Sequence, residues 1–214
     1  MPGAPDLALE RELLAAGFGS IAGLDEAGRG AWAGPLLAAA VILPLDDPQR
    51  LAQLTGVRDS KALDPVARVR CERSIRSAAR AVGVGEASVG EVDALGPLRA
   101  SRLAMQRALQ NLGAAPQFLL IDYLCLPEAE QPQAGLPQGD ARVLSIAAAS
   151  VVAKVARDRR MISLERRFPG YGFDRHKGYG TAAHQAALER LGVSPIHRRS
   201  YAPVAAHLRP GPAS

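Results

Sequence analysis

Hydrophobic residues along this chain occur both in short continuous runs and in stripes at helical spacing, a pattern typical of an α/β protein. Continuous apolar runs predict one strand that starts at Ile21 and others over 36–43, 81–88 and 118–121. Helical spacing and capping residues predict helices over 6–16, from Asp64 onward, over 97–112 and over 145–168. A further helix is expected after residue 181 and ends at about residue 191. Only the Gly34-Pro35 break and a few residues separate the first two strands, so we expect a hairpin-like start.

The chain has 214 residues, enough for one well-buried core. We expect a single catalytic domain over 1–214, with a core over about 1–180, a helical extension over about 181–209 and a disordered tail over 210–214. The segment 124–140 is rich in Pro, Gly and Gln without periodicity, so it is expected to be a surface loop.

Two adjacent carboxylates, Asp25 and Glu26, come at the end of the first strand. Open α/β sheets bind their ligands at the carboxyl ends of strands. Neighbouring carboxylates that are even half-buried repel each other, and they stay ionised mainly when a cation lies between them. Because hard oxygen ligands suit Mg²⁺ or Mn²⁺, these two acids predict a divalent metal site.

Two more acids are placed to join that site. Asp122 ends the strand over 118–121, and Asp158 lies three to four turns into the helix over 145–168. A two-metal hydrolase needs about four carboxylates around ions roughly 3.5–4 Å apart. A solvated acidic loop explains any one of these acids alone, but all four together predict metal-assisted chemistry on phosphate.

The glycines after the acids allow a second interpretation. Gly28, Gly30 and Gly34 resemble the spacing of a dinucleotide-binding loop. Two carboxylates directly before the loop would repel a pyrophosphate, and the segment from Pro35 has the pattern of a strand rather than of a phosphate-binding helix. We therefore favour close approach of the backbone to a ligand, with Arg29 as a donor to a phosphate or sugar.

The net charge of +5 and the pI of 9.7 favour an anionic partner such as nucleic acid, although an arginine bias also follows from genome composition. Lys61 is expected on a loop before a helix, where it can contact phosphate. Tyr179, between two glycines in a basic cluster, is expected to stack on a sugar or base. The four histidines show no ligand spacing and are expected at the surface: His176, His184, His197 and His207.

Cys71 and Cys125 are far apart in the sequence and predict neither a disulfide framework nor a zinc site. No segment resembles a signal peptide, and the apolar runs are too short to span a bilayer. We expect a soluble, cytoplasmic protein.

Five motifs together resemble type 2 ribonuclease H (ribonuclease HII). They are LDEAGRG at 24–30, DSK at 59–61, LID at 120–122, SIAAASVVAKVARD at 145–158 and HKGYGT at 176–181, and PIHRRSYAPV follows from Pro195. The resemblance implies a ribonuclease H-like α/β fold, with a central mixed five-stranded sheet flanked by helices and a helical C-terminal extension. It implies an endoribonuclease that cleaves the RNA strand of RNA/DNA hybrids and nicks duplex DNA 5′ of an embedded ribonucleotide, leaving a 3′-hydroxyl and a 5′-phosphate.

The resemblance also implies roles for single residues. The ligands of two Mn²⁺ or Mg²⁺ ions would be Asp25, Glu26, Asp122 and Asp158. The residues that contact the substrate would be Gly28, Arg29, Gly30, Lys61 and Tyr179, with the Gly-Arg-Gly loop on the 2′-hydroxyl and the tyrosine on the neighbouring deoxyribose. The partners would be RNA/DNA hybrids and ribonucleotide-containing duplex DNA. The protein would act as a monomer and would not bind a membrane.

Four positions depart from the expected pattern: Ala31, Tyr123, Gln138 and Ala156. Tyr123 has the most consequence, because a bulky side chain beside Asp122 could narrow the metal site. Alternatives are a type 3 ribonuclease H, which usually has an extra N-terminal domain, a resolvase of the same fold, and a hybrid-binding protein without activity. The last predicts a missing acid, whereas all four are present.

Overall fold

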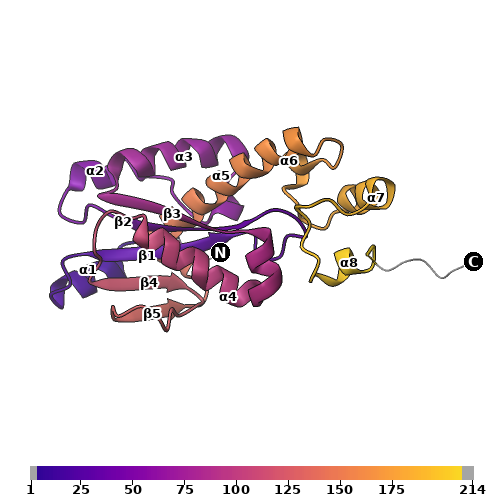
Figure 1. Cartoon of the computed structure of the whole chain (residues 1–214). Helices are drawn as coiled ribbons and strands as arrows, with labels where there is room; N and C mark the ends of the chain where they lie inside the picture. The colour runs from indigo at the N-terminus through magenta and orange to yellow at the C-terminus, as the bar shows by residue number, and fades with distance from the viewer. Residues whose placement is uncertain (1–3, 209–214) are drawn as a thin grey trace, which may run out of the picture.

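The computed structural model describes residues 4–208, so the tail over 210–214, predicted to be disordered, lies outside the described residues. Five strands form one mixed sheet in the order β3-β2-β1-β4-β5 (Figure 1). The strands are β1 (Ile21–Ala27), β2 (Leu36–Ile42), β3 (Ala81–Ala87), β4 (Phe118–Asp122) and β5 (Gln133–Leu136). β1 and β2 are antiparallel neighbours, whereas β4 and β5 run parallel to β1. The predicted mixed five-stranded sheet and its hairpin-like start are confirmed.

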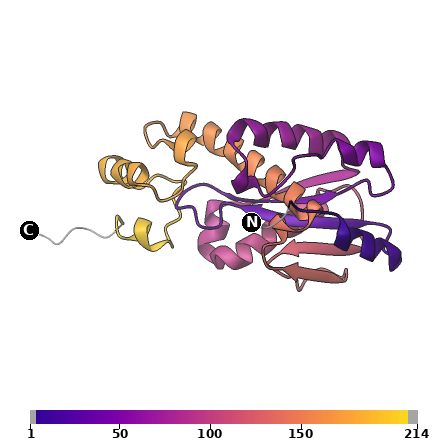
Figure 2. The same ribbon diagram turned by 180° about the vertical axis from the view of Figure 1, so that it is seen from behind.

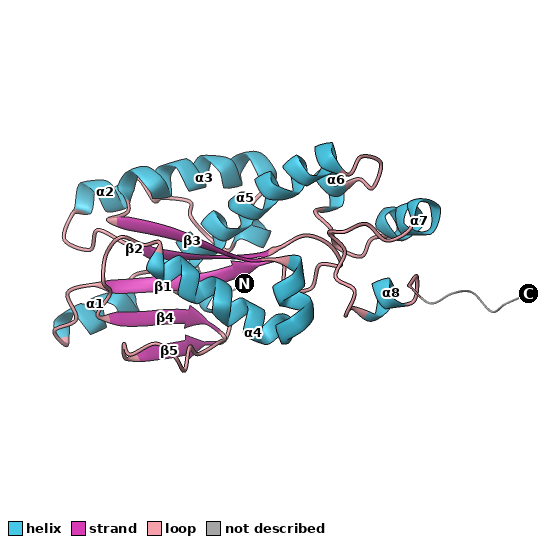
Figure 3. Cartoon of the chain, in the orientation of Figure 1, coloured by secondary structure: helices cyan, strands magenta, loops and turns pink. Residues whose placement is uncertain are grey.

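Helices cover both faces of this sheet (Figure 3). The helices are α1 (Ala8–Ala15), α2 (Pro48–Ala52), α3 (Pro65–Ala78), α4 (Val89–Gln110), α5 (Leu144–Arg167), α6 (Phe173–His176), α7 (Ala182–Leu191) and α8 (Ala202–Ala205), with 3₁₀ turns η1 (Ser60–Ala62) and η2 (Gly139–Ala141). Helix α4 packs on one face, while α5, with α3 against it, packs on the other.

Strand β2 shows why the sheet has two covered faces. All seven of its residues are buried, and they are apolar without exception. Side chains alternate along a strand, so Ala38 and Ala40 pack in the α4 core while Ala39 and Val41 pack in the α3 and α5 core. The continuous apolar run that predicted the strand follows from this burial on both sides.

One prediction of secondary structure is extended and one is corrected. The helix predicted from Pro97 is present as the second part of α4, since Gly96 leaves the helical conformation at φ +76° and kinks the chain; a first part from Val89, opened by the capping box of Ser88 and Glu91, precedes it. The segment 124–140 is not only loop: it contains β5 and the first two residues of η2. Strand β5 has no apolar pattern because it is a half-buried edge strand, held by main-chain pairing with β4.

The C-terminal helices α6, α7 and α8 lie at one end of the molecule, as both views show (Figures 1 and 2). The parallel strands β1, β4 and β5 point their C-terminal ends toward that end (Figure 3). No helix within 4–208 has the length and apolar character needed to cross a membrane. In the same range Cys71 and Cys125 are free.

Candidate active site

Three carboxylates meet at the C-terminal ends of the parallel strands. Asp25 of β1, Asp122 of β4 and Asp140 of η2 each offer an oxygen, and these oxygens lie within 4.8 Å of one another. Strand register explains the first two, since Leu24 pairs with Ile121 and each acid comes one residue later. The third is fixed by the turn before it, where the Gly139 N–H donates to Oδ1 of Asp122 at 2.8 Å.

Asp25 is the most buried member of the cluster, with 4% of its surface exposed. Burial raises the pKa of Asp25 well above its usual range, and the nearby charges of Glu26 and Asp122 raise it further. Ser150 of α5 acts in the opposite direction and lowers this pKa. Such a group is ionised most readily with a cation beside it, so the cluster fits a divalent metal ion held by oxygen ligands.

Glu26 approaches the cluster from the opposite face of the sheet, because successive side chains of a strand alternate. Its side chain is 7% exposed, and the Nε atom of Arg29 lies 3.2 Å from its Oε1. Burial raises the pKa of Glu26; Arg29 lowers it, while Asp122 raises it further. The structure thus pairs Glu26 with Arg29 and leaves it outside the group of three carboxylates whose oxygens lie within 4.8 Å of one another.

Asp140 is the site residue that sequence reasoning missed. Its Oδ2 lies 3.2 Å from Nζ of Lys61 in η1. Burial lowers the pKa of Lys61, but Asp140 and Asp59 outweigh it and the pKa is raised. The only indication in the sequence was a Gly-Asp pair just before the long helix, inside a segment interpreted as loop.

Asp158 lies on α5 but is not part of the carboxylate group found among residues 4–208. Its Oδ1 accepts from Nζ of Lys154 at 2.7 Å, and its Oδ2 accepts from Arg68 at 3.5 Å. Arg68 also donates to the main-chain oxygens of Ser60 and Leu63, on either side of Lys61. The structure thus gives Asp158 two cationic partners and places Asp140, not Asp158, beside Asp25 and Asp122.

The Gly28–Gly30 loop is shaped by a buried arginine. Gly28 has φ +94°, and a Cβ there would lie 1.9 Å from Nε of Arg157. Arg157 is fully buried and donates to the main-chain oxygens of Ala33 and Pro35. At Gly30, by contrast, a Cβ would meet no atom of the described chain within 4 Å, so the loop is open on that side.

Tyr179 lies on the other side of the same arginine. Its ring centroid is 5.2 Å from Cζ of Arg157 and 5.8 Å from Nζ of Lys154, and the residue is 37% exposed. The main-chain N–H of Trp32 donates to the Gly178 oxygen at 2.8 Å, which joins the two loops directly. An exposed aromatic face therefore lies next to the glycine loop, as a stacking role requires.

Two expectations about individual residues change. Tyr123 is 66% exposed with φ +60°, so its side chain extends into solvent and the concern that it narrows the metal site is not supported. His184 and His197 are 0% and 1% exposed, so the prediction of surface positions is wrong for both. Contacts among distant segments bury them, and no spacing along the chain indicates those contacts.

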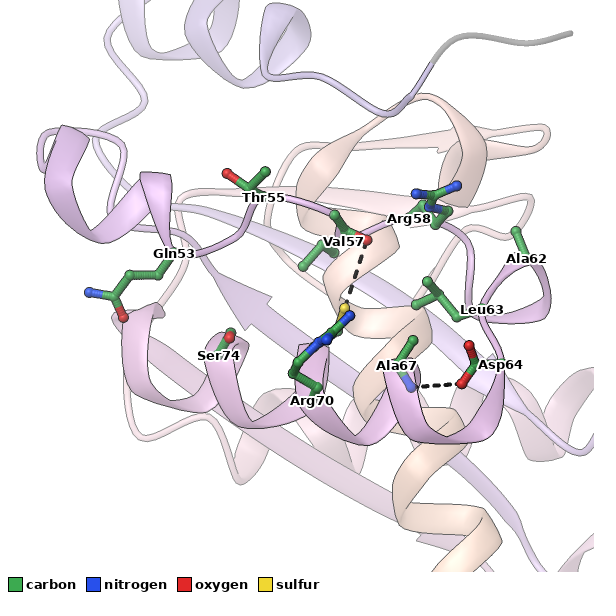
Figure 4. A pocket seen from close by; sticks show the side chains of 12 residues that line it. Gln53, Thr55, Val57, Arg58, Ala62, Leu63, Asp64, Ala67, Arg70 and Ser74 are labelled. Carbon is green, nitrogen blue, oxygen red and sulfur yellow. Dashed lines mark hydrogen bonds between the residues drawn. The ribbon is translucent and has the colours of Figure 1, made fainter.

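A cavity of about 380 Å³ lies apart from the carboxylates, between α3 and the loop over 53–58 (Figure 4). The acid on its wall, Asp64, accepts from the Ala67 N–H and caps α3. None of the clustered carboxylates Asp25, Asp122 and Asp140 lines this cavity.

Comparison with known proteins identifies the family of this chain. The family model described as Ribonuclease HII matches residues 22–204. Ribonuclease HII of Chloroflexus aggregans is 52% identical over 200 residues, which is 94% of each chain. Ribonuclease HII of Dehalococcoides mccartyi is 49% identical over 207 residues, covering 95% of this chain and 97% of that one.

Solved structures show the same fold. Ribonuclease H2 from Pyrococcus horikoshii superposes with a TM-score of 0.73 at 25% identity, covering 87% of this chain and 96% of the other. An RNase HIII structure in complex with Mn²⁺ has a TM-score of 0.68 at 22% identity, covering 92% and 72%, and supports the fold alone. The extent of the family match and the high identity to curated relatives establish that this chain belongs to the ribonuclease HII family of endoribonucleases.

Proposed function

We propose that this endoribonuclease cleaves the RNA strand of RNA/DNA hybrids and nicks duplex DNA 5′ of a single embedded ribonucleotide, leaving 3′-hydroxyl and 5′-phosphate ends. The observation that carries the proposal is the position of Arg157, which packs against Gly28 and lies 5.2 Å from the Tyr179 ring. Arg157 thus contacts both the glycine loop, which can approach a 2′-hydroxyl, and the Tyr179 ring, which can stack on the next sugar. The 2′-hydroxyl is the group that separates RNA from DNA at such a site.

The oxygen donors fit two Mn²⁺ or Mg²⁺ ions. Asp25, Asp122 and Asp140 would hold them, with Glu26 at the edge of the group. When bound, such ions lower the pKa of a water molecule and stabilise the leaving 3′-oxygen. The residues of the chain need only hold the phosphate and sugar in line, so no protein nucleophile is required.

A second cavity supports binding of a phosphate backbone. It has a volume of about 310 Å³. Its cationic lining residues are Arg68, Lys154, Arg159, Arg175 and Lys177. Lys154 also lies near Tyr179, so a strand stacked there would continue over these cations. Such contacts position a duplex without reading its sequence. We propose that Asp158 orients Lys154 and Arg68 in this cavity, instead of binding metal.

We further propose that the chain acts as a cytoplasmic monomer with one catalytic domain. Sedimentation of the purified protein, alone and with a short hybrid, tests the monomer.

The decisive experiment compares three duplexes with Mg²⁺ or Mn²⁺: DNA with one ribonucleotide, an RNA/DNA hybrid and all-DNA. We expect a nick 5′ of the ribonucleotide, extension of the product by a DNA polymerase because it ends in a 3′-hydroxyl, and no cleavage of all-DNA. Asp25→Asn should abolish the nick. Cleavage of the hybrid alone would refute the junction assignment, and no cleavage with either metal would favour a hybrid-binding protein.

A further inference from the structure

Two buried histidines connect the C-terminal segment with the tyrosine loop. His184 belongs to α7, and His197 lies in the segment Ser194–Tyr201 that precedes α8, here called the positioning segment. The Nε2 atoms of the two rings are 3.1 Å apart. Neither ring has a part in the proposed chemistry. A buried polar group costs free energy unless its hydrogen bonds are satisfied, so the partners of both rings matter.

Fixed main-chain donors and acceptors determine the proton positions on both rings. The Ser194 N–H points at Nδ1 of His197 at 3.0 Å, so this nitrogen accepts and the proton lies on Nε2. His197 therefore donates to Nε2 of His184. His184 then has its proton on Nδ1, from which it donates to the main-chain oxygen of Tyr179 at 3.0 Å.

The result is a directional relay from Ser194 through two neutral imidazoles to the residue that carries the stacking ring. Burial lowers the pKa of both histidines to about 4, so both rings are neutral at physiological pH. His176 packs against the relay. Its ring stacks on that of His184 with 4.4 Å between the ring centroids, and its Nδ1 accepts from the Gly178 N–H.

The positioning segment also holds the glycine loop. Arg198 is fully buried, and its Nη1 donates to the Arg29 main-chain oxygen at 2.9 Å. The Tyr201 hydroxyl donates to the same oxygen at 2.5 Å. One short segment thus makes hydrogen bonds to the main chain of both Arg29 and, through the relay, Tyr179.

We propose that His184 and His197 are positioning residues that set the distance between the Tyr179 ring and the Gly28–Gly30 loop, and thereby the preference for a single ribonucleotide in DNA. The proposal rests on the proposed function. Because neither ring touches substrate, loss of the relay is expected to change discrimination between substrates more than the chemical step.

Paired substitutions at His197 separate the relay from simple packing. Asn retains an acceptor near the Ser194 N–H but cannot reach His184, whereas Gln can place an N–H near the lost Nε2. We expect His197→Asn to lower the ratio of kcat/KM for the one-ribonucleotide duplex over that for the hybrid by about 10-fold, since a displacement of about 1 Å can cost more than this. His197→Gln should recover part of the ratio, and the matched control His207→Asn should leave it unchanged.

The Tyr179→Ala background provides the stricter test. Residues that act through one another are non-additive, so His197→Asn should not change the ratio further once the ring is absent. An equal loss on both substrates, or the same loss of ratio in the Tyr179→Ala background, would overturn the proposal and leave a purely structural role.

A measurement without substrate keeps the two proposals distinct. Ring ¹⁵N spectra of the wild type should show His197 protonated at Nε2 and His184 at Nδ1, and His197→Asn should shift the Tyr179 amide and ring resonances. If the tautomers and the Tyr179 shift are as expected but the protein fails to nick the junction, the proposed function is refuted and the relay is not. Other tautomers, or an unshifted Tyr179, would refute the relay whatever the activity.

Discussion

The Nζ atom of Lys61 lies 3.2 Å from Oδ2 of Asp140, although 79 positions separate the two residues in the sequence. This contact joins the Asp-Ser-Lys turn to the carboxylate cluster. The Ser150 hydroxyl of α5 donates to the hydroxyl of the neighbouring Ser60 at 2.9 Å. The Lys61 side chain is 77% exposed, and its ion pair with the buried Asp140 places a positive charge beside the acids.

The assignment of Asp140 makes a prediction that separates it from Asp158. Asp140→Asn should lower kcat by more than about 100-fold, since loss of groups that merely support metal ligands costs about 10–100-fold. Asp158→Asn should act mainly on KM, because it weakens the orientation of Lys154 and Arg68. Steady-state kinetics on one hybrid measures both. A greater loss of kcat in Asp158→Asn than in Asp140→Asn would restore Asp158 as the fourth ligand.

Burial of Asp25, together with like-charge repulsion in the cluster, predicts an unusual stability effect. Without metal, Asp25→Asn should raise Tm, because it removes a buried carboxylate whose ionised form is disfavoured. The raised pKa means that Asp25 costs the wild type stability as pH rises above the usual aspartate range. Added Mn²⁺ should stabilise the wild type by about 2.7 kcal/mol at 100 times its Kd, and the variant by much less. Thermal melts with and without metal test both statements; equal stabilisation by Mn²⁺ would contradict them.

Gly28 and Gly30 form a matched pair. Gly28→Ala places a Cβ against Arg157 at a positive φ, so it should destabilise the fold by at least about 1–3 kcal/mol. Gly30→Ala meets open space and should leave Tm unchanged while it weakens binding of the ribonucleotide duplex. Melting curves and binding by fluorescence anisotropy distinguish the two. An unchanged affinity in Gly30→Ala would remove Gly30 from the substrate contacts.

The two buried histidines predict sensitivity to acid. Their pKa values are lowered by burial from 6.5 to about 4, so the unfolded chain binds more protons between these values. Stability should therefore be full above about pH 6.5 and should fall as pH decreases toward 4, by up to about 3 kcal/mol per histidine. Urea unfolding at several pH values measures the slope. His184→Gln should flatten it, and an unchanged slope in that variant would assign the effect to other groups.

Tyr123 follows Asp122 in the left-handed region at φ +60° with an exposed side chain. Tyr123→Gly should remove about 1 kcal/mol of backbone strain, partly offset by the entropy of glycine in the unfolded state, and should raise Tm by about 1–2 °C. Tyr123→Ala keeps the strain and should give no increase. Activity should persist in both variants, and inactivity of Tyr123→Gly would show that the ring serves the site.

Much of the architecture follows from the sequence itself. The apolar run of 36–43 and the acids at the C-terminal ends of the first and fourth strands are local patterns, because a strand buried on both faces must be apolar and its C-terminal end must lie at the sheet edge. For this reason Asp25, Glu26 and Asp122 could be predicted at strand ends together with the hairpin-like start, whereas the mixed five-stranded sheet followed from the family resemblance. The motifs around them were sufficient to indicate the ribonuclease HII family, which the comparisons confirm.

The tertiary structure alone decided which acid completes the cluster. Asp140 lies beside Asp25 because it follows β5, an edge strand without apolar periodicity. Asp158 lies on a strongly patterned helix and is paired with Lys154 and Arg68 instead. The burial of His184 was equally hidden, because its hydrogen bonds lead to His197 and to the main chain of Tyr179. Periodicity records which face of an element is buried, whereas such contacts depend on how distant elements pack, and no pattern along one element contains that information.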